Sequence, residues 1–172
     1  RVLTRAPMNA ATHPIRRDPA GRVTVRGVDA LAGAGNRLTV GPSINSLNNG
    51  EVTSLEQNAP PVEARFAGLE RLNEAGIQTF VSMSPTYPTQ DRDDLRKLMS
   101  RIARLDPGVV YHEPNNPRGN NFELTVAAAE RAGEMELARA LTEIQSPSAW
   151  REYACRHFQA VQEIGEELGL PI

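Results

Sequence analysis

The sequence predicts an α/β protein built from parallel strands, and two repeated patterns support this. Short apolar segments bounded by glycine and proline alternate with longer stretches whose apolar residues recur every three to four positions, the period of an amphipathic helix. Each apolar segment also runs into a polar loop, most clearly where Ile77, Phe80 and Val81 precede Ser84 and Pro85. Parallel strands joined by crossover helices explain both patterns, because such strands all end at one edge of the sheet.

Four segments have the β-branched or aromatic content and the turn boundaries of strands. They are residues 2–4, 38–43, 78–82 and 109–112. Pro7 and Pro14 predict a loop after the first strand, and Asp18 to Gly21 has the composition of a turn. The proline-rich residues 85–88 predict that the third strand ends at Ser82, because proline lacks the N–H that a ladder needs.

Helices are predicted between and after these strands. They cover residues 25–31, 51–57, 60–76, 89–105, 122–132, 134–144 and 146–169. Thr89 is the expected N-cap of the fourth, and the acidic residues in its first turn suit the helix dipole. No strand is predicted after residue 119, so the chain divides into residues 1–119 with the strands and a helical extension over residues 120–172.

Composition sets limits on the class of protein. The chain has 172 residues, a formal charge of −2 and 40% hydrophobic residues, which suit one globular domain. No apolar run is long enough to span a membrane and no leader pattern is present, so we expect no membrane partner and a cytoplasmic location. Cys155 alone supports neither a disulfide framework nor an iron–sulfur site, and its helical context predicts a buried or half-buried packing thiol.

The sequence begins with strand-like residues and has no initiator methionine. We therefore expect it to be the downstream part of a longer polypeptide. Its first strand would then have an unpaired edge, through which the fragment could self-associate.

Polar side chains gather at the predicted carboxyl ends of the strands, where parallel α/β folds bind ligands. They are Arg5, Ser43, Asn45, Ser46, Ser82, Ser84, Tyr87, His112, Glu113 and Asn115. This set suits a polar small molecule that bears a carboxylate and hydroxyl groups.

His112 and Glu113 form one potential acid/base pair. Adjacent strand residues point to opposite faces, so both can enter one pocket only if the strand ends between them. Other chemistries find less support, because three histidines do not supply a hydrolytic metal centre of the barrel type and no glycine-rich phosphate loop is present.

Residues 38–88 resemble the second half of a radical S-adenosylmethionine (SAM) core, in the branch related to spore photoproduct lyase. The similar features are the strand Leu-Thr-Val-Gly-Pro-Ser-Ile-Asn-Ser-Leu, the stretch Glu-Gln-Asn-Ala-Pro-Pro-Val-Glu-Ala-Arg, and an Ala-Gly-Ile strand that ends at a proline loop. Residues 2–5 are similar to the preceding strand of that core. The likeness extends over about residues 2–111.

The resemblance implies a partial (β/α) barrel fragment with about four parallel strands. It implies that the full-length parent binds SAM and a [4Fe-4S] cluster and cleaves SAM reductively to start radical chemistry on an unknown substrate. By position, Ser43 and Asn45 would reach the ribose, Ser82 and Ser84 the adenine side, and Arg5 the methionyl carboxylate. Nucleic acid is a partner that the resemblance alone suggests.

The three-cysteine cluster loop of that family is missing from this sequence. We therefore expect the fragment by itself to hold neither cofactor and to be inactive. Two alternatives stay open: a non-catalytic α/β module that binds a small polar ligand or a protein partner, and a different barrel enzyme that uses His112 and Glu113.

One structural prediction concerns Glu56 and Arg65, which flank the turn at Pro60 and Pro61. A cation in the first turns of a helix is poorly placed for the helix dipole unless an anion holds it. We predict that the two pair across the turn and support the pocket wall, without a catalytic role.

Overall fold

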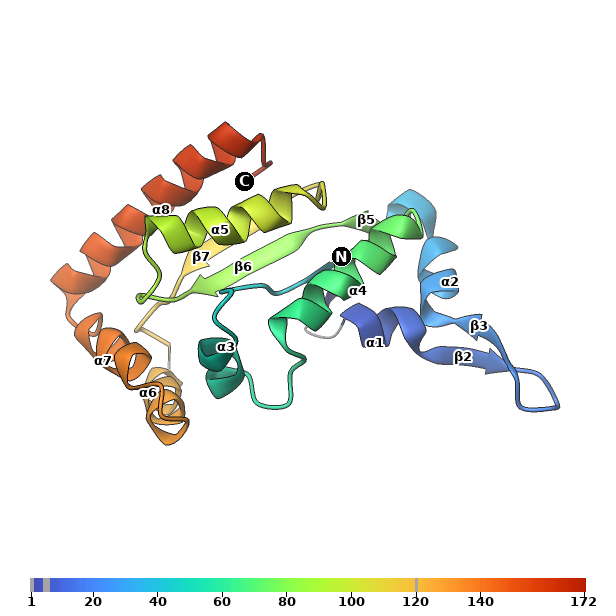
Figure 1. Cartoon of the computed structure of the whole chain (residues 1–172), viewed down its shortest axis with the longest axis horizontal. Coiled ribbons are helices and arrows are strands. Elements are labelled where there is room, and N and C mark those ends of the chain that lie inside the picture. The colour runs from blue at the N-terminus through green and yellow to red at the C-terminus, as the bar shows by residue number, and fades with distance from the viewer. Residues whose placement is uncertain (1, 5–6, 120) are drawn as a thin grey trace.

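The computed structural model describes residues 2–4, 7–119 and 121–172, and it has a mixed α/β architecture with small parallel sheets (Figure 1). Three short strands pair in parallel in the order β1 (Val2–Thr4), β4 (Thr39–Pro42) and β5 (Gln78–Thr79). A second parallel pair joins β6 (Val81–Thr86) and β7 (Val110–Pro114). The predicted parallel α/β class is confirmed.

The two parallel sheets are continuous with each other. Ser43 and Ser82 form an isolated parallel bridge, and the backbone N–H of Ile44 donates to the carbonyl of Ser82 at 2.9 Å. Phe80 interrupts the predicted third strand, so β5 pairs with β4 and β6 pairs with β7. Among the described residues these strands do not close into a barrel, because β1 and β7 lie at opposite ends of the order.

Helices α4 (Val62–Glu74), α5 (Arg92–Ala103) and α8 (Pro147–Leu168) pack on one face of these strands. The side chains of Val81, Met83 and Val110 point to this face and are 0–1% exposed. Because successive strand residues alternate between faces, Ser82 and Ser84 point the other way. The larger apolar core therefore lies between strands and helices and leaves polar side chains on the opposite face.

The prediction that β6 ends at Ser82 is wrong. The strand continues to Thr86, with Pro85 at an irregularity where the ladder shifts register between Met83 and Thr86. A proline is tolerated there because a bulge leaves a residue without a ladder hydrogen bond. Ser84 therefore lies inside the strand.

The region before β4 differs most from the prediction. The predicted loop contains α1 (Pro7–Thr12), and an antiparallel hairpin of β2 (Pro14–Arg17) and β3 (Val23–Arg26) replaces the predicted start of the next helix. The helix itself, α2, begins at Gly27 and ends at Ala32, before the short 3-10 turn Gly35–Arg37. Pro7 and Pro14 each stand at the first position of their element, where a missing N–H costs little.

The start of α5 also corrects a prediction. Asp91 is its N-cap and accepts from the N–H of Asp94 at 2.8 Å, whereas the Thr89 hydroxyl donates to Glu51. Glu51 lies in α3 (Asn49–Leu55), which begins two residues earlier than predicted because Asn48 caps it. Thr89 therefore makes a tertiary hydrogen bond to α3 and does not cap α5.

The chain ends in helices, as predicted: α6 (Phe122–Arg131), α7 (Met135–Glu143) and the long α8. Gly169 terminates α8 in a left-handed conformation with φ of 67°, and the tail then folds back. The carbonyl of Pro171 accepts from the N–H of Val110 at 2.8 Å, so the tail covers part of the outer edge of β7.

The exposure of Cys155 corrects an expectation drawn from composition. Cys155 is exposed on α8, so the prediction of a buried or half-buried thiol is wrong; the helix turns this position away from the core. Across the described ranges, none of the helices has the length and apolar character needed to cross a membrane.

Candidate functional site at the strand ends

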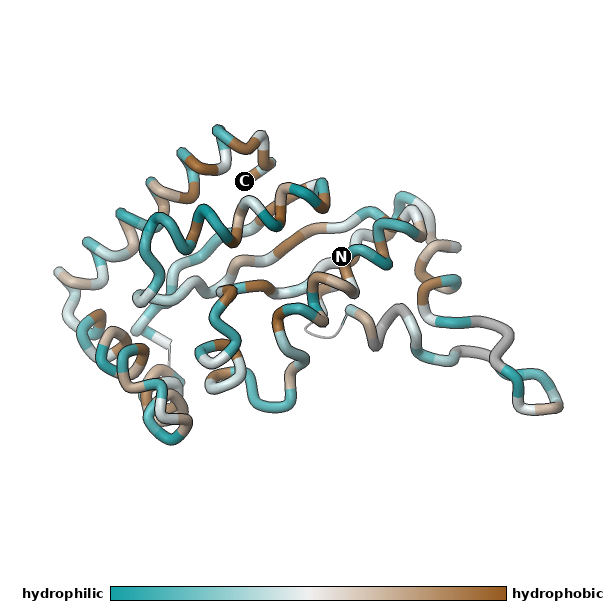
Figure 2. The backbone as a smooth tube through the Cα atoms, in the orientation of Figure 1, coloured by the Kyte–Doolittle hydropathy of each residue, from teal (hydrophilic) through white to brown (hydrophobic). Residues whose placement is uncertain are grey.

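A pocket of about 380 Å³ lies at the carboxyl ends of β4, β6 and β7. The hydropathy of the chain changes there: Figure 2 shows the apolar middle of β6 giving way to polar residues toward its C-terminal end. Three strand ends, α3 and α6 supply the walls. The lining residues are Asn45, Leu55, Glu56, Ser84, Pro85, Tyr87, Glu113, Pro114, Asn115, Asn116, Asn121, Phe122 and Thr125.

The predicted site residues have different positions relative to this pocket. Asn45 and Ser84 line it, whereas Ser43 and Ser82 do not, although both lie close by. Ser43 is 5% exposed and donates to Asn45 Oδ1 at 2.7 Å, and Ser82 is 8% exposed at the bridge between the sheets. Arg5 lies outside the described residues.

A buried polar network supports the wall at Asn45. The side chain of Asn45 is 1% exposed, and its Nδ2 donates to Glu56 Oε1 at 3.0 Å and to the Tyr87 hydroxyl at 3.4 Å. The other oxygen of Glu56 lies 2.8 Å from Arg65 Nη2. The Asn45 amide is therefore fixed from both of its ends, because Nδ2 donates to Glu56 and Tyr87 and Oδ1 accepts from Ser43.

Arg65 and Glu56 form the predicted pair across the proline turn. The Arg65 side chain is fully buried, and it also donates to the carbonyls of Pro60 at 2.9 Å and Ser43 at 3.0 Å. One guanidinium therefore joins the turn, the end of β4 and Glu56. The prediction of a supporting ion pair beneath the pocket wall is confirmed.

Tyr87 closes the inner side of the pocket. Burial raises the pKa of its phenol to about 12, against the opposing effect of the hydrogen bond from Asn45. The phenol is therefore neutral at physiological pH, and its oxygen can donate or accept a hydrogen bond.

The β7 end of the pocket is held in place by α8. Trp150 Nε1 donates to the carbonyl of Asn115 at 3.0 Å, and the N–H of Asn115 donates to the Tyr153 hydroxyl at 2.7 Å. The same hydroxyl donates to the carbonyl of Thr86 on β6 at 2.7 Å. Two aromatic side chains of α8 thus fix the distance between the ends of β6 and β7.

His112 and Glu113 do not share a pocket, because β7 continues to Pro114 and alternation separates them. Glu113 is exposed and accepts from the Ser84 hydroxyl at 3.1 Å at the pocket. His112 instead packs against the Phe158 ring of α8, with ring centroids 5.3 Å apart. The alternative of an acid/base pair formed by these two residues is therefore overturned.

His112 belongs to a separate buried cluster with Thr86 and His157. The Thr86 hydroxyl lies 3.1 Å from His112 Nε2 and 3.2 Å from His157 Nδ1, and His157 Nε2 lies 3.0 Å from the carbonyl of Gln90. A carbonyl only accepts, so His157 carries its proton on Nε2 and accepts from Thr86 at Nδ1. Burial lowers the pKa of both histidines to about 4.

Glu51 forms a second carboxylate site, in a neighbouring pocket of about 400 Å³. It is 6% exposed and accepts from Thr89 at 2.5 Å and from Ser46 at 3.1 Å. Burial raises the pKa of this carboxyl group. These bonds tie α3 to the loops after β4 and β6. Ser46, a predicted ligand contact, is therefore engaged with Glu51.

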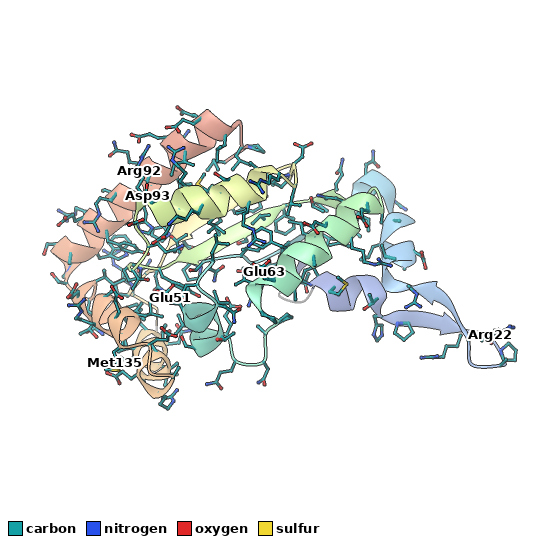
Figure 3. The ribbon with its side chains drawn as sticks, in the orientation of Figure 1. Arg22, Glu51, Glu63, Arg92, Asp93 and Met135 are labelled. Atoms are coloured by element: carbon teal, nitrogen blue, oxygen red, sulfur yellow. The ribbon has the colours of Figure 1, made fainter. Side chains whose placement is uncertain are left out.

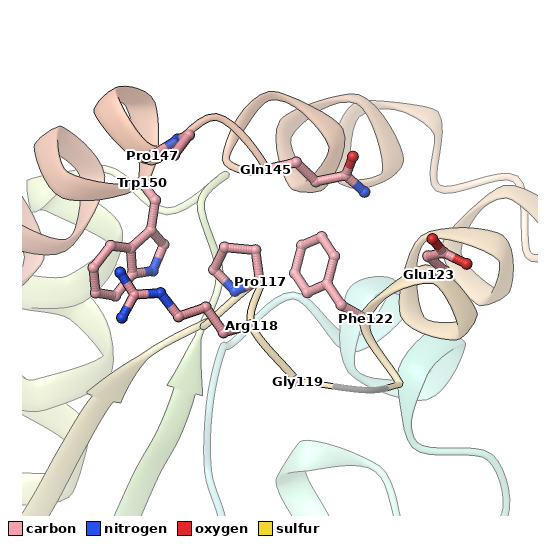
Figure 4. Close-up of a pocket in the computed structure, with 8 residues that line it drawn as sticks. All are labelled: Pro117, Arg118, Gly119, Phe122, Glu123, Gln145, Pro147 and Trp150. Atoms are coloured by element: carbon pink, nitrogen blue, oxygen red, sulfur yellow. The ribbon is translucent and has the colours of Figure 1, made fainter.

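A third hollow, of about 480 Å³, lies between the loop after β7 and the start of α8 (Figure 4). The guanidinium of Arg118 lies 5.3 Å from the ring centroid of Trp150, and Phe122 lines both this hollow and the strand-end pocket. In the described ranges, no group of three or more His, Cys, Asp or Glu residues is placed to hold a metal ion.

Comparisons with known proteins give one relative and no family. No family model matches the chain, and no solved structure matches it. The uncharacterized protein ORF301 of Acidianus two-tailed virus is 26% identical over 106 residues, which are 59% of this chain and 35% of the relative. The chain thus spans about a third of the length of that relative.

Proposed function

We propose that the pocket at the ends of β4, β6 and β7 binds a polar small molecule, and that in the full-length parent this molecule is SAM. One observation carries the proposal: side chains from three parallel strand ends converge on one pocket, where α/β folds place their ligands. The parent would be a radical SAM enzyme, and this chain the downstream part of its partial barrel, with residues 1–119 in the barrel and 120–172 as a helical extension.

The arrangement of the elements is consistent with this fold. Strands β1, β4 and β5/β6 are each separated from the next by helices, and α4, α5 and α8 cover one face. In a partial barrel the other face would be the interior, and the polar residues Ser84 and Glu113 lie there at the carboxyl end. We propose the radical SAM family because residues 38–88 resemble the core of those enzymes.

The charge of the pocket fits SAM. SAM carries two cationic centres, its sulfonium and its ammonium, and the exposed carboxylate of Glu113 lines the pocket, whereas the charge of Glu56 is already paired with Arg65. Ser84, Tyr87 and the asparagines at the rim add neutral groups that can bond ribose hydroxyls and adenine nitrogens. Glu113 and Ser84 would hold the ligand directly, and bound SAM would supply the adenosyl group for chemistry.

The iron–sulfur cluster does not fit the residues of this chain. The sequence has one cysteine, and Cys155 is exposed on α8 outside the residues that line the pocket. Three thiolates would have to come from residues outside this sequence. The residues that line the strand-end pocket are nevertheless all in this chain, so we revise for SAM the expectation that the chain holds neither cofactor: by itself it should bind SAM without cleaving it.

Isothermal titration calorimetry with SAM tests the proposal. We expect saturable binding, weakened about tenfold or more by Glu113→Gln, since a hydrogen bond to a charged group contributes about 1.5–3 kcal/mol. Glu143→Gln, an exposed change on α7 with the same loss of charge, is the control and should leave the affinity unchanged. The absence of saturable heat with SAM would contradict the proposal.

A non-catalytic module that binds another small polar ligand is the second candidate. Hydrogen bonds within the pocket walls favour this candidate, because they suit a rigid binding scaffold. They join Ser43 to Asn45, Asn45 to Glu56, and Ser84 to Glu113. Adenosine, which lacks both cationic centres, separates the two. Equal affinity for adenosine and SAM would favour the module.

A further inference from the structure

The β2–β3 hairpin is the feature of this molecule that the strand-end pocket leaves unexplained. Its two strands pair with each other and lead into α2, and its loop projects away from the parallel strands (Figure 1). Arg22 lies at the far end of this projection (Figure 3). Such a two-stranded ribbon can reach a large partner without bringing the rest of the protein close to it.

Positive charge is concentrated in the hairpin. Residues 13–26 contain four arginines and one aspartate, which give a formal charge of +3 with His13 neutral. The whole chain carries −2, so the remaining residues carry −5. The described arginines Arg17, Arg22 and Arg26 are all exposed, and the side chain of Arg22 is 81% exposed.

The single acidic residue of the hairpin has a structural role. Asp18 Oδ1 accepts from the N–H groups of Ala20 and Arg22, both at 2.9 Å, and Oδ2 accepts from Arg22 Nε at 2.7 Å. The bond from Arg22 lowers the pKa of this carboxyl group, so it remains charged. This contact uses only Nε of Arg22, whose side chain is exposed, so it leaves the two Nη groups for an external anion.

We propose that the β2–β3 hairpin binds the phosphodiester backbone of nucleic acid. Guanidinium groups match phosphate oxygens through paired hydrogen bonds, and a two-stranded ribbon has the width to enter the major groove of a duplex. The projection keeps the net negative remainder of the chain away from the polyanion. This inference does not depend on the ligand of the strand-end pocket.

The loop composition argues against a lipid surface as the partner. Residues 18–22 are Asp-Pro-Ala-Gly-Arg and include no aromatic or large apolar side chain. Hairpins and helices that insert into the membrane interface use such side chains as anchors. The hairpin offers charge without an anchor, which suits a soluble polyanion.

Fluorescence anisotropy with a labelled duplex DNA and a labelled single-stranded RNA tests the proposal. We expect the unmodified chain to bind at least one of them with a Kd of about 10⁻⁴–10⁻⁶ M, the range for backbone contacts. The triple variant Arg17→Gln, Arg22→Gln and Arg26→Gln should weaken binding at least about tenfold at low salt. For the duplex, it should lower the slope of log K against log salt by about 2.7, from three lost contacts.

The control is the triple variant Arg131→Gln, Arg139→Gln and Arg151→Gln, which removes three exposed arginines from α6, α7 and α8 at the other end of the molecule. It changes the net charge equally and should leave binding unchanged. A second hairpin variant with lysine at the same three positions keeps the charge and should retain most of the affinity. Circular dichroism verifies that each variant folds.

Three results would overturn the proposal. The unmodified chain could fail to bind either nucleic acid at low salt, or the control variant could lose as much affinity as the hairpin variant. The third is stronger binding to phosphatidylglycerol vesicles than to nucleic acid, lost in the glutamine hairpin variant, which would assign the hairpin to a membrane surface.

Discussion

Two ion pairs in this protein have nearly the same geometry and opposite surroundings. Arg65 and Glu56 lie 2.8 Å apart with side chains 0% and 6% exposed, whereas Arg92 and Glu163 lie 2.6 Å apart with 44% and 42% exposed. The first pair sits beneath the strand-end pocket, and the second joins the surfaces of α5 and α8. Distance therefore says little about the role of an ion pair, and the surrounding burial says much more.

The largest effect should follow from removing Arg65. Arg65→Gln leaves the buried carboxylate of Glu56 without the cation that faces it, and breaking a buried pair costs about 3–5 kcal/mol. Urea unfolding should show this loss of stability. The double variant with Glu56→Gln should recover part of it, because the uncompensated charge is then removed. A double variant whose losses simply add would contradict coupling between the two.

His157 is a buried base that hydrogen-bonds neutral groups, and it can be compared with Arg65, which is paired with a carboxylate. Arg65 faces the carboxylate of Glu56, whereas His157 is 3% exposed and hydrogen-bonds Thr86 and a backbone carbonyl. Burial lowers its pKa from 6.5 to about 4, so between these values the unfolded chain binds a proton that the folded chain does not. Stability should therefore be complete above pH 6.5 and fall as the pH drops toward 4.

The size of this effect follows from the shift in pKa. A shift of this size corresponds to up to about 3 kcal/mol for His157. His157→Gln keeps a hydrogen-bonding side chain and removes the titration, so its free energy of unfolding should fall less between pH 6.5 and 4. Identical pH profiles for the two proteins would show that His157 is not responsible.

The smallest effect is expected at the exposed pair. Arg92→Gln should change the free energy of unfolding by about 0–1 kcal/mol, since solvent screens the attraction. Added salt should reduce this difference further. A loss as large as that of Arg65→Gln would contradict the contrast between the two pairs.

The sequence was most informative where local chemistry decides the outcome. The Glu56–Arg65 pair followed from a misplaced cation beside a proline turn, and the end of α8 followed from Gly169. The hairpin was missed because residues 23–26 begin with an alternation too short to distinguish a strand from a helix start. Its turn at Asp18 was nevertheless recognised.

The candidate site was predictable only in part. Strand ends correctly located the pocket and identified Asn45 and Ser84 as lining residues. Ser43 forms hydrogen bonds inside the protein, and Ser82 lies at the bridge between the two parallel sheets. Residue type and sequence position alone do not reveal either of these contacts. The contributions of Leu55 from α3 and Phe122 from α6 depend on tertiary packing between distant segments and gave no local signal.

Titration of the ¹⁵N-labelled chain with SAM, followed through its backbone amide resonances, tests the central claim most directly. The account predicts that the largest shifts fall on Ser84, Glu113 and Asn116 at the strand-end pocket. Resonances of the β2–β3 hairpin should stay unchanged. The absence of shifts, or shifts confined to Arg118 and Trp150 in the neighbouring hollow, would contradict it.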